Sequence, residues 1–248
     1  MITSKQNALI KEIRSLADKK YRDKLGLFVV EGIKPINEAI ELKLPIRAII
    51  CTEKAFPQIN GEGQRVELVA DEVLKSVSEE VSPQGALAVV IKPEVELRAP
   101  TGNCLLLDGV ADPSNIGAII RTAVASNFKQ VYMTKESADP YAQKAVRASM
   151  SGIFRVEIMR GEVSEILKVI NLPIYVGDMD GENVFQHKVK SAVCLVIGNE
   201  GHGVSEKVKR MANVTVKIPM ENGMESLNAA VSAGILMYAL KESAEKSF

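Results

Sequence analysis

Histidine, cysteine and tryptophan are scarce in this chain of 248 residues, which has two, three and none of them. His187 and His202 do not stand in a ligand-spaced cluster with cysteine or acidic residues, so the sequence predicts no metal site. Cys51, Cys104 and Cys194 lie far apart, in or beside apolar runs. We interpret them as small buried side chains in a reducing compartment rather than as disulfide partners or a catalytic thiol.

The sequence also lacks a net charge and any long apolar run. Lys and Arg together number 31, as do Asp and Glu, so the net charge does not indicate a nucleic-acid partner, although this sum would miss a local basic face. No apolar run approaches the length of a membrane span. Residues 1–20 carry charges throughout, unlike a signal peptide. We therefore expect a cytoplasmic protein without membrane association.

The first part of the chain alternates between helix and strand patterns. An apolar stripe predicts a helix from the N-terminus to about Lys20. Strands are predicted at 27–32, 46–52, 66–70 and 85–92. Helices are predicted at 34–42 and 71–79, and Asp71 is the expected N-cap of the second of these helices. Two prolines and a glycine within 93–103 indicate a linker. The predicted domains are therefore residues 1–95 and 103–248, joined by a linker at 96–102.

The second part has more continuous apolar strands. They are predicted at 103–109, 130–134, 154–159, 173–178, 192–198 and 214–219, and the helices between and after them at 113–126, 140–149, 163–170, 204–211 and 226–241. Unbroken apolar strands that alternate with helices predict an α/β fold with a mostly parallel sheet covered on both faces.

A first polar motif follows the strand that ends at Asp108. Asp112 is a fair N-cap, and Pro113 suits the first helical position. Asn115 stands in the opening turn, and Gly117 removes bulk from the approach to Arg121, four residues further on the same stripe. From these residues alone, Arg121 could equally be a functional residue or an ordinary solvated residue of the helix.

A second motif, IGNEGHG, places three glycines at a strand end: Gly198, Gly201 and Gly203. It is not a dinucleotide fingerprint, and no Gly-Lys-Ser/Thr follows as in a P-loop. A tight turn would explain the glycines. With Asn199 and Glu200 between them, the pattern favours close approach of backbone to a ligand.

A third motif follows the last strand. Residues 221–223 form a predicted turn, and Ser226 is a good N-cap for the helix that comes next. Capping by Ser226 leaves Asn228 unexplained. This residue would lie two positions inside the helix, where asparagine is a poor helix former. The small residues of this helix permit tight packing against other backbone or a second subunit.

Together the segments NIGAIIR (115–121), IGNEGHGVS (197–205) and IPMENGMESLNAAVSAGI (218–235) resemble the SpoU/TrmH family of SPOUT ribose methyltransferases. The likeness spans about 103–240, and residues 27–92 look like the L30e-like substrate-binding domain that precedes it in many members. The resemblance implies a deep trefoil knot, an exception to the rule against threaded chains.

The resemblance also implies an S-adenosylmethionine pocket. Backbone around Gly198, Ile218 and Leu227 would form it, with Gly177, Asn199, Gly201 and Met220 as neighbours. The family's catalytic arginine falls on Arg121. The other polar site residues would be Asn115, Glu200, Ser226 and Asn228.

The reaction that the resemblance implies is methylation of a ribose 2′-hydroxyl, which is a very weak acid. The family picture casts Arg121 as the group that draws off its proton. Because a guanidinium stays protonated, we instead expect Arg121 to grip the neighbouring phosphate and stabilise the developing alkoxide. Asn115, Ser226 and Asn228 would fix the ribose, while Glu200 would orient Arg121 or accept the proton.

The resemblance further implies an RNA substrate and a homodimer. Ribosomal RNA is expected above transfer RNA because of the separate L30e-like domain. Basic residues would contact phosphates, and they are Lys5, Lys11, Arg14, Lys19, Lys20, Arg22, Lys24, Lys144 and Arg147. The N-terminal domain has few aromatic candidates for base stacking, which favours recognition by shape and backbone over the reading of single-stranded sequence.

Two other readings compete with a ribosomal RNA methyltransferase. A protein of the same fold that binds RNA without methyl transfer is disfavoured by the intact polar set. A nucleotide-binding oxidoreductase is disfavoured by the missing dinucleotide fingerprint.

Overall fold

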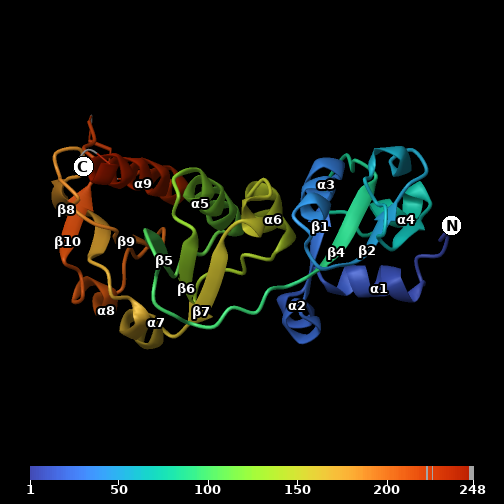
Figure 1. The fold of residues 1–248 in the computed structure, drawn as a ribbon, viewed down its shortest axis with the longest axis horizontal. Helices are drawn as coiled ribbons and strands as arrows, with labels where there is room; N and C mark the ends of the chain where they lie inside the picture. Colours follow the sequence, from blue (N-terminus) through green and yellow to red (C-terminus); the bar gives the residue numbers. More distant parts are fainter. Residues whose placement is uncertain (222, 225, 246–248) are drawn as a thin grey trace. The chain divides into compact units, whose positions relative to one another are not determined.

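The computed structural model describes residues 1–221, 223–224 and 226–245, in two compact units. The first unit joins Met1–Glu94 to Asp139–Phe154, and the second contains Val95–Ala138 and the chain from Arg155 onward. Figure 1 shows the elements of each unit. Residues 139–154 thus group with the N-terminal part of the chain, although the sequence analysis placed them in the second domain.

The first unit has a four-stranded mixed sheet in the order β1-β4-β2-β3. Its β2–β3 pair is parallel and its other pairs are antiparallel. The elements are α1 (Ala8–Ser15), α2 (Lys19–Leu25), β1 (Leu27–Glu31), α3 (Ile33–Glu41), β2 (Ile46–Cys51), η1 (Phe56–Gln58), β3 (Val66–Leu68), α4 (Asp71–Lys75), β4 (Ala86–Ile91), α6 (Gln143–Ala148) and η2 (Gly152–Phe154).

One helix was predicted at the N-terminus, and the structure has two. The side chain of Asn7 accepts a hydrogen bond at the start of α1, and that of Asp18 does so at the start of α2. Each cap satisfies a main-chain N–H that a helix start leaves open. The predicted cap of α4 is wrong, because the helix begins at Asp71 and Ala70 takes the cap position.

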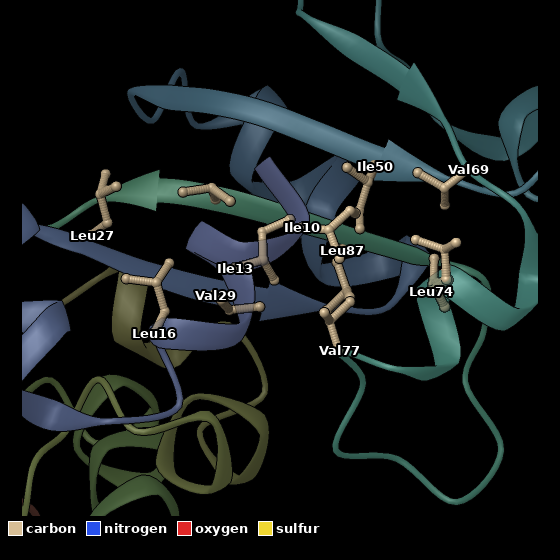
Figure 2. Close-up of a cluster of buried hydrophobic side chains, with 12 residues drawn as sticks. Ile10, Ile13, Leu16, Leu27, Val29, Ile50, Val69, Leu74, Val77 and Leu87 are labelled. Carbon is tan, nitrogen blue, oxygen red and sulfur yellow. The ribbon is translucent and has the colours of Figure 1, made fainter. Parts of the chain in front are cut away.

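The apolar stripe of α1 covers one face of this sheet. Ile10, Ile13 and Leu16 are buried against strand residues such as Val29 and Leu87, as Figure 2 shows. Their spacing of three is that of one helix face, which is why this stripe could be read from the sequence.

The second unit has a six-stranded sheet in the order β10-β8-β9-β5-β6-β7. All five strand pairs are parallel, which confirms the predicted α/β fold class. The elements are β5 (Cys104–Asp108), α5 (Pro113–Ala125), β6 (Gln130–Thr134), β7 (Glu157–Gly161), α7 (Val163–Val169), β8 (Ile174–Asn183), β9 (Cys194–Gly198), α8 (Glu206–Lys209), β10 (Val214–Lys217) and α9 (Ala229–Glu245).

Helices cover both faces of this sheet. In Figure 1, α5 and α9 lie on one side of it, and α7 and α8 on the other. α9 packs against α5, and a Cβ at Gly234 would stand 3.5 Å from Thr122 Cγ2, an ordinary van der Waals contact. On the opposite face, Ile166 of α7 and Val208 of α8 share one buried cluster with Leu106 of β5.

The pairing of β8 with β10 contains a long register break. Thr215 pairs with Val176, but the next residue, Val216, pairs with Glu182. Residues 177–181 therefore have no partner on β10. At Gly181 a Cβ would lie 2.6 Å from main-chain atoms of Thr215 and Val216, so the two backbones meet where only glycine fits. The predicted knot is not tested by strand order and stays a prediction.

The three cysteines are free and buried, as predicted. Within the described ranges, no helix is both long and apolar enough to traverse a lipid bilayer.

Candidate active site

The three polar motifs follow β5, β9 and β10, strands of one parallel sheet. Parallel strands carry their carboxyl ends to the same edge, where open α/β sheets bind ligands. β5 and β9 are direct neighbours, and Asp108 pairs with Gly198 at their ends. The sheet thus sets the first two motifs side by side.

A chain of hydrogen bonds joins all three motifs. The amide nitrogen of Asn228 donates to Oδ1 of Asn115 at 3.0 Å. The amide nitrogen of Asn115 in turn donates to Oε1 of Glu200 at 2.8 Å. Asn115 is 8% exposed, whereas Glu200 and Asn228 are exposed, so the link runs from the surface to a buried amide. Three segments far apart in the sequence therefore form one polar cluster.

Glu200 fixes the loop before α5. Its carboxylate accepts the main-chain N–H of Ala111 at 3.0 Å and that of Asp112 at 3.3 Å. Partial burial favours a higher pKa for Glu200, but the hydrogen bonds from Ala111, Asn115 and Asp112 outweigh it and lower the pKa. The carboxylate is therefore held ionised. No hydrogen bond or ion pair joins it to Arg121 among the described residues, so the expected orientation of Arg121 by Glu200 is not seen.

Asn199 holds the second motif in shape. Its amide nitrogen donates to the carbonyl of Gly109 at 2.7 Å, and its Oδ1 accepts from the N–H groups of Gly201 and His202. Its main chain pairs with Gly203 in both directions at 2.9 Å. All these bonds are internal, so any contribution of Asn199 to cofactor binding comes through the loop that it fixes.

Gly198 is required by close packing of backbone. A Cβ at this position would overlap main-chain atoms of Gly203 and Val204. At Gly177 a Cβ would lie 2.8 Å from Leu236, a contact that brings α9 against β8. Gly201 has room, because its nearest neighbour would be Asn199 Oδ1 at 3.6 Å. Of these three glycines, only Gly198 is required by contact with neighbouring backbone.

Asp108 belongs to this site, although it was not predicted from the sequence. It is 8% exposed, and its Oδ2 accepts the N–H of Ser205 at 2.7 Å. This bond ties the end of β5 to the loop after β9. The feature of the sequence that could have indicated Asp108 is its position as the one carboxylate at the end of an otherwise apolar strand.

The residues after β10 offer main-chain groups for a ligand. No hydrogen bond joins the main chain of Ile218 or of Leu227 to another described residue. Ile218 and Met220 are half-buried, and Leu227 is 38% exposed. Unused N–H and C=O groups beside apolar side chains suit the adenine and amino-acid parts of S-adenosylmethionine. Asn222 and Glu225 of the third motif lie outside the described residues.

The predicted N-cap of the last helix is wrong. α9 begins at Ala229, and Oδ1 of Asn228 accepts the N–H groups of Ala230 at 2.9 Å and Val231 at 3.3 Å. Asn228 is therefore the cap, which explains a residue that capping by Ser226 left unexplained. Ser226 is exposed and makes no hydrogen bond to another described residue.

Arg121 stands apart from the polar cluster. It is an exposed residue of α5, four positions after the buried Gly117. It makes no hydrogen bond or ion pair with any residue that the structure describes. Its guanidinium is thus available to an external anion.

One member of the predicted basic surface is not on the surface. Arg22 is 4% exposed and forms an ion pair with Asp139 at 2.8 Å. Its Nη1 also donates to the carbonyls of Leu16 and Ala17. Every one of these bonds is internal to the first unit, so the expected phosphate contact of Arg22 is wrong.

Two protein-family models match this chain. The model described as the SpoU rRNA Methylase family matches residues 102–238. The chain belongs to this family. A second model, the MRM3-like substrate binding domain, matches residues 7–88 of this SpoU-family protein. The family predicted from the three motifs is confirmed.

Curated relatives and solved structures are similar over nearly the whole length. The chain is 30% identical over 254 residues to the 23S rRNA (guanosine(2553)-2′-O)-methyltransferase of Bacillus subtilis, covering 97% of this chain and 98% of the relative. An AdoMet-bound rRNA methyltransferase from Sinorhizobium meliloti superposes with a TM-score of 0.86, at 27% identity and with 96% and 95% of the two chains covered. The SpoU methyltransferase AviRb from Streptomyces viridochromogenes, in complex with AdoMet, also gives 0.86, at 26% identity with 98% and 100% covered.

Proposed function

We propose that this SpoU-family protein transfers the methyl group of S-adenosylmethionine to a ribose 2′-hydroxyl of ribosomal RNA. The observation that carries the proposal is the hydrogen-bonded cluster of Asn115, Glu200 and Asn228. It joins three motifs in a chain that matches a 23S rRNA 2′-O-methyltransferase from end to end.

The cofactor-binding part of the site comprises main chain and small residues. Main-chain groups at Gly198, Ile218 and Leu227 would hold S-adenosylmethionine, with Gly177, Asn199, Gly201 and Met220 around it. Bound there, the cofactor supplies a methyl group activated by its sulfonium. The protein's task is then to bring the ribose to it, and positioning alone contributes up to about 7–11 kcal/mol in well-oriented reactions.

The substrate-binding part consists of the polar residues. Arg121, exposed and free of partners among the described residues, would bind the phosphate beside the target ribose and stabilise negative charge on the 2′-oxygen. Asn115, Asn228 and Ser226 would position the ribose. Glu200 would act as a positioning residue, because it fixes the loop that presents Asn115.

We extend the proposal to a cytoplasmic homodimer. Val231 and Tyr238 of α9 are 51% and 44% exposed, and their spacing of seven places both on one helix face. An apolar face of this kind is suited to a second copy of the chain. Sedimentation of the wild type as a dimer and of Val231→Lys/Tyr238→Lys as a monomer would support this assembly; a monomeric wild type would contradict it.

The test of the activity combines transfer and binding. Arg121→Ala is expected to abolish methyl transfer to ribosomal RNA while S-adenosylmethionine still binds by calorimetry. Arg210→Ala, a charge loss at an exposed position of the same unit, is the control and should retain transfer. Arg121→Ala activity within about tenfold of wild type, or 1.4 kcal/mol in barrier, would contradict the assignment.

Substrate choice is tested by mapping 2′-O-methyl groups in total RNA with and without the protein. A site that disappears from ribosomal RNA supports the proposal. A site in transfer RNA favours the tRNA alternative, and RNA binding without any lost methyl group favours a non-catalytic protein.

A further inference from the structure

A cavity of about 210 Å³ opens in the first unit, apart from the residues of the three motifs. It lies beside the carboxyl end of β1 and the first turns of α3, and residues of α6 and η2 line it as well. Val30, Pro35, Val146 and Phe154 supply apolar lining. Residues 139–154, which the chain contributes from between β6 and β7, are thus used to complete a cavity in the substrate-binding unit.

Two lining residues have an unusual backbone. Met150 and Ser151 are consecutive, neither is glycine, and their φ values are 47° and 65°. L-residues adopt this left-handed region rarely, and strain of this kind concentrates at functional sites. The turn they form places both residues on the cavity wall.

Ser151 also carries an unused hydroxyl. The residue is only 5% exposed, yet the structure gives its side chain no hydrogen bond to any described residue. Its oxygen is not among the fully buried side-chain atoms that lack a partner, so it can be reached from the cavity. A hydroxyl that lines a cavity without an internal partner is a place for a polar group of a ligand.

The charged groups of the cavity divide into acceptors and cations. Glu31 and Glu80 contribute half-buried carboxylates. Burial raises the pKa of Glu31, against a hydrogen bond from Ser78 and with the nearby charge of Glu80 adding to the rise. Lys34 and Arg147 line the cavity as exposed residues and make no ion pair with a described residue.

We propose that this cavity receives one unstacked base of the RNA substrate and prefers a base with an exocyclic amino group, guanine, cytosine or adenine, over uracil. Apolar walls suit the faces of a base, carboxylates accept from amino groups on its edge, and Lys34 and Arg147 bind the flanking phosphates. The inference rests on the proposed function and deepens it. It also departs from the expectation, drawn from the few aromatics, that recognition by shape and backbone is favoured over the reading of single-stranded sequence.

The experiment measures binding of four labelled RNA pentamers to the full-length protein by fluorescence anisotropy at one fixed salt concentration. The pentamers are UUGUU, UUCUU, UUAUU and UUUUU, which differ only in the central base. UUGUU, UUCUU and UUAUU are expected to bind about tenfold more tightly than UUUUU, as one good base contact provides.

Variants locate the preference. Ser151→Gly removes the hydroxyl at a backbone conformation that glycine adopts readily, so the fold is retained. Glu80→Gln removes the carboxylate without changing its size. Both are expected to reduce the preference to less than about twofold. Asn127→Gly, at another position of positive φ (66°) and outside the cavity, is the matched control and should keep it.

Arg147→Glu probes the phosphate contact. It should weaken all four pentamers to a similar extent, because a phosphate contact carries no base information.

Equal binding of the four pentamers to the wild type, or a preference that persists in Ser151→Gly and Glu80→Gln, would overturn the inference. Methyl transfer to ribosomal RNA is measured separately on the same wild-type preparation. If transfer occurs but no base preference exists, the cavity inference fails and the proposed function stands. If the preference exists and depends on Ser151 and Glu80 without any transfer, the inference stands and the proposed function fails.

Discussion

Asn228 at the start of α9 donates a hydrogen bond of 3.0 Å to Asn115 of α5, across 113 positions of sequence. The other side of the same amide accepts the N–H groups of Ala230 and Val231. One side chain thus begins a helix and joins the third motif to the first. Because the amide is bound on both sides, its orientation is fixed, which a site that positions a ribose requires.

Separating these two tasks gives a first prediction. Asn228→Ala loses both the helix cap and the hydrogen bond to Asn115. It should lower the free energy of unfolding by about 1 kcal/mol, and it should also reduce methyl transfer. Asn228→Asp keeps the capping oxygen but has no N–H for Asn115. Asn228→Asp should therefore regain the stability of the wild type in urea denaturation, but it should not regain methyl transfer. Full activity of Asn228→Asp would show that the link to Asn115 is dispensable.

Two glycines in different surroundings provide a second prediction. Gly198→Ala places a Cβ into the backbone of Gly203 and Val204, so the loop must shift. We expect loss of S-adenosylmethionine binding in calorimetry and a cost of about 1–3 kcal/mol in stability, as for other overpacked positions. Gly102→Ala, whose Cβ would meet no atom within 4 Å, lies outside the cofactor site; it is the matched control and should bind the cofactor. Equal binding by both variants would contradict this account.

The lowered pKa of Glu200 predicts a dependence of stability on pH. A carboxyl group with a pKa below its unfolded value stabilises the fold above that value, and the contribution is lost as pH falls through the folded pKa. The ordinary value is 4.5. Wild type should therefore exceed Glu200→Gln in free energy of unfolding by a constant amount from pH 7 to pH 5, and the gap should narrow below 4.5. A gap that widens on acidification would show that the charged form is not the stabilising one.

The buried ion pair of Arg22 and Asp139 gives a fourth prediction. Arg22→Met or Asp139→Asn leaves a partner without its counter-charge and should lower the free energy of unfolding by about 3–5 kcal/mol. Lys19→Met, which breaks an exposed pair with Asp23, should cost less than about 1 kcal/mol. In urea denaturation, the double variant should lose less than the sum of the two single losses. Additive losses would mean that the pair is not coupled.

The sequence was most informative for the strands of the second unit. The prediction for β6 agrees with the structure at both ends, 130–134, because a strand buried on both faces is an unbroken apolar run. The strand predicted at 154–159 lies instead at Glu157–Gly161. Phe154 suits a strand by composition, but it ends the 3₁₀ turn η2 that follows the strained pair Met150 and Ser151.

Polar residues were harder to place. Ser226 and Asn228 are both good caps, and the local sequence does not choose between them. The structure uses Asn228, the one whose amide also reaches Asn115. Likewise Arg22 belongs by spacing to a basic helix surface, and only its burial beside Asp139 removes it from that surface.

By itself, the sequence determined the parallel α/β unit and the family, because buried strands and three short motifs are written in neighbouring residues. The tertiary structure alone decided which polar groups meet: Asn228 with Asn115, Glu200 with the loop before α5, and residues 139–154 with the first unit. Local periodicity reports which face of an element is buried. It carries no information about the distant group that this face will contact, since that group is chosen by packing of the whole chain.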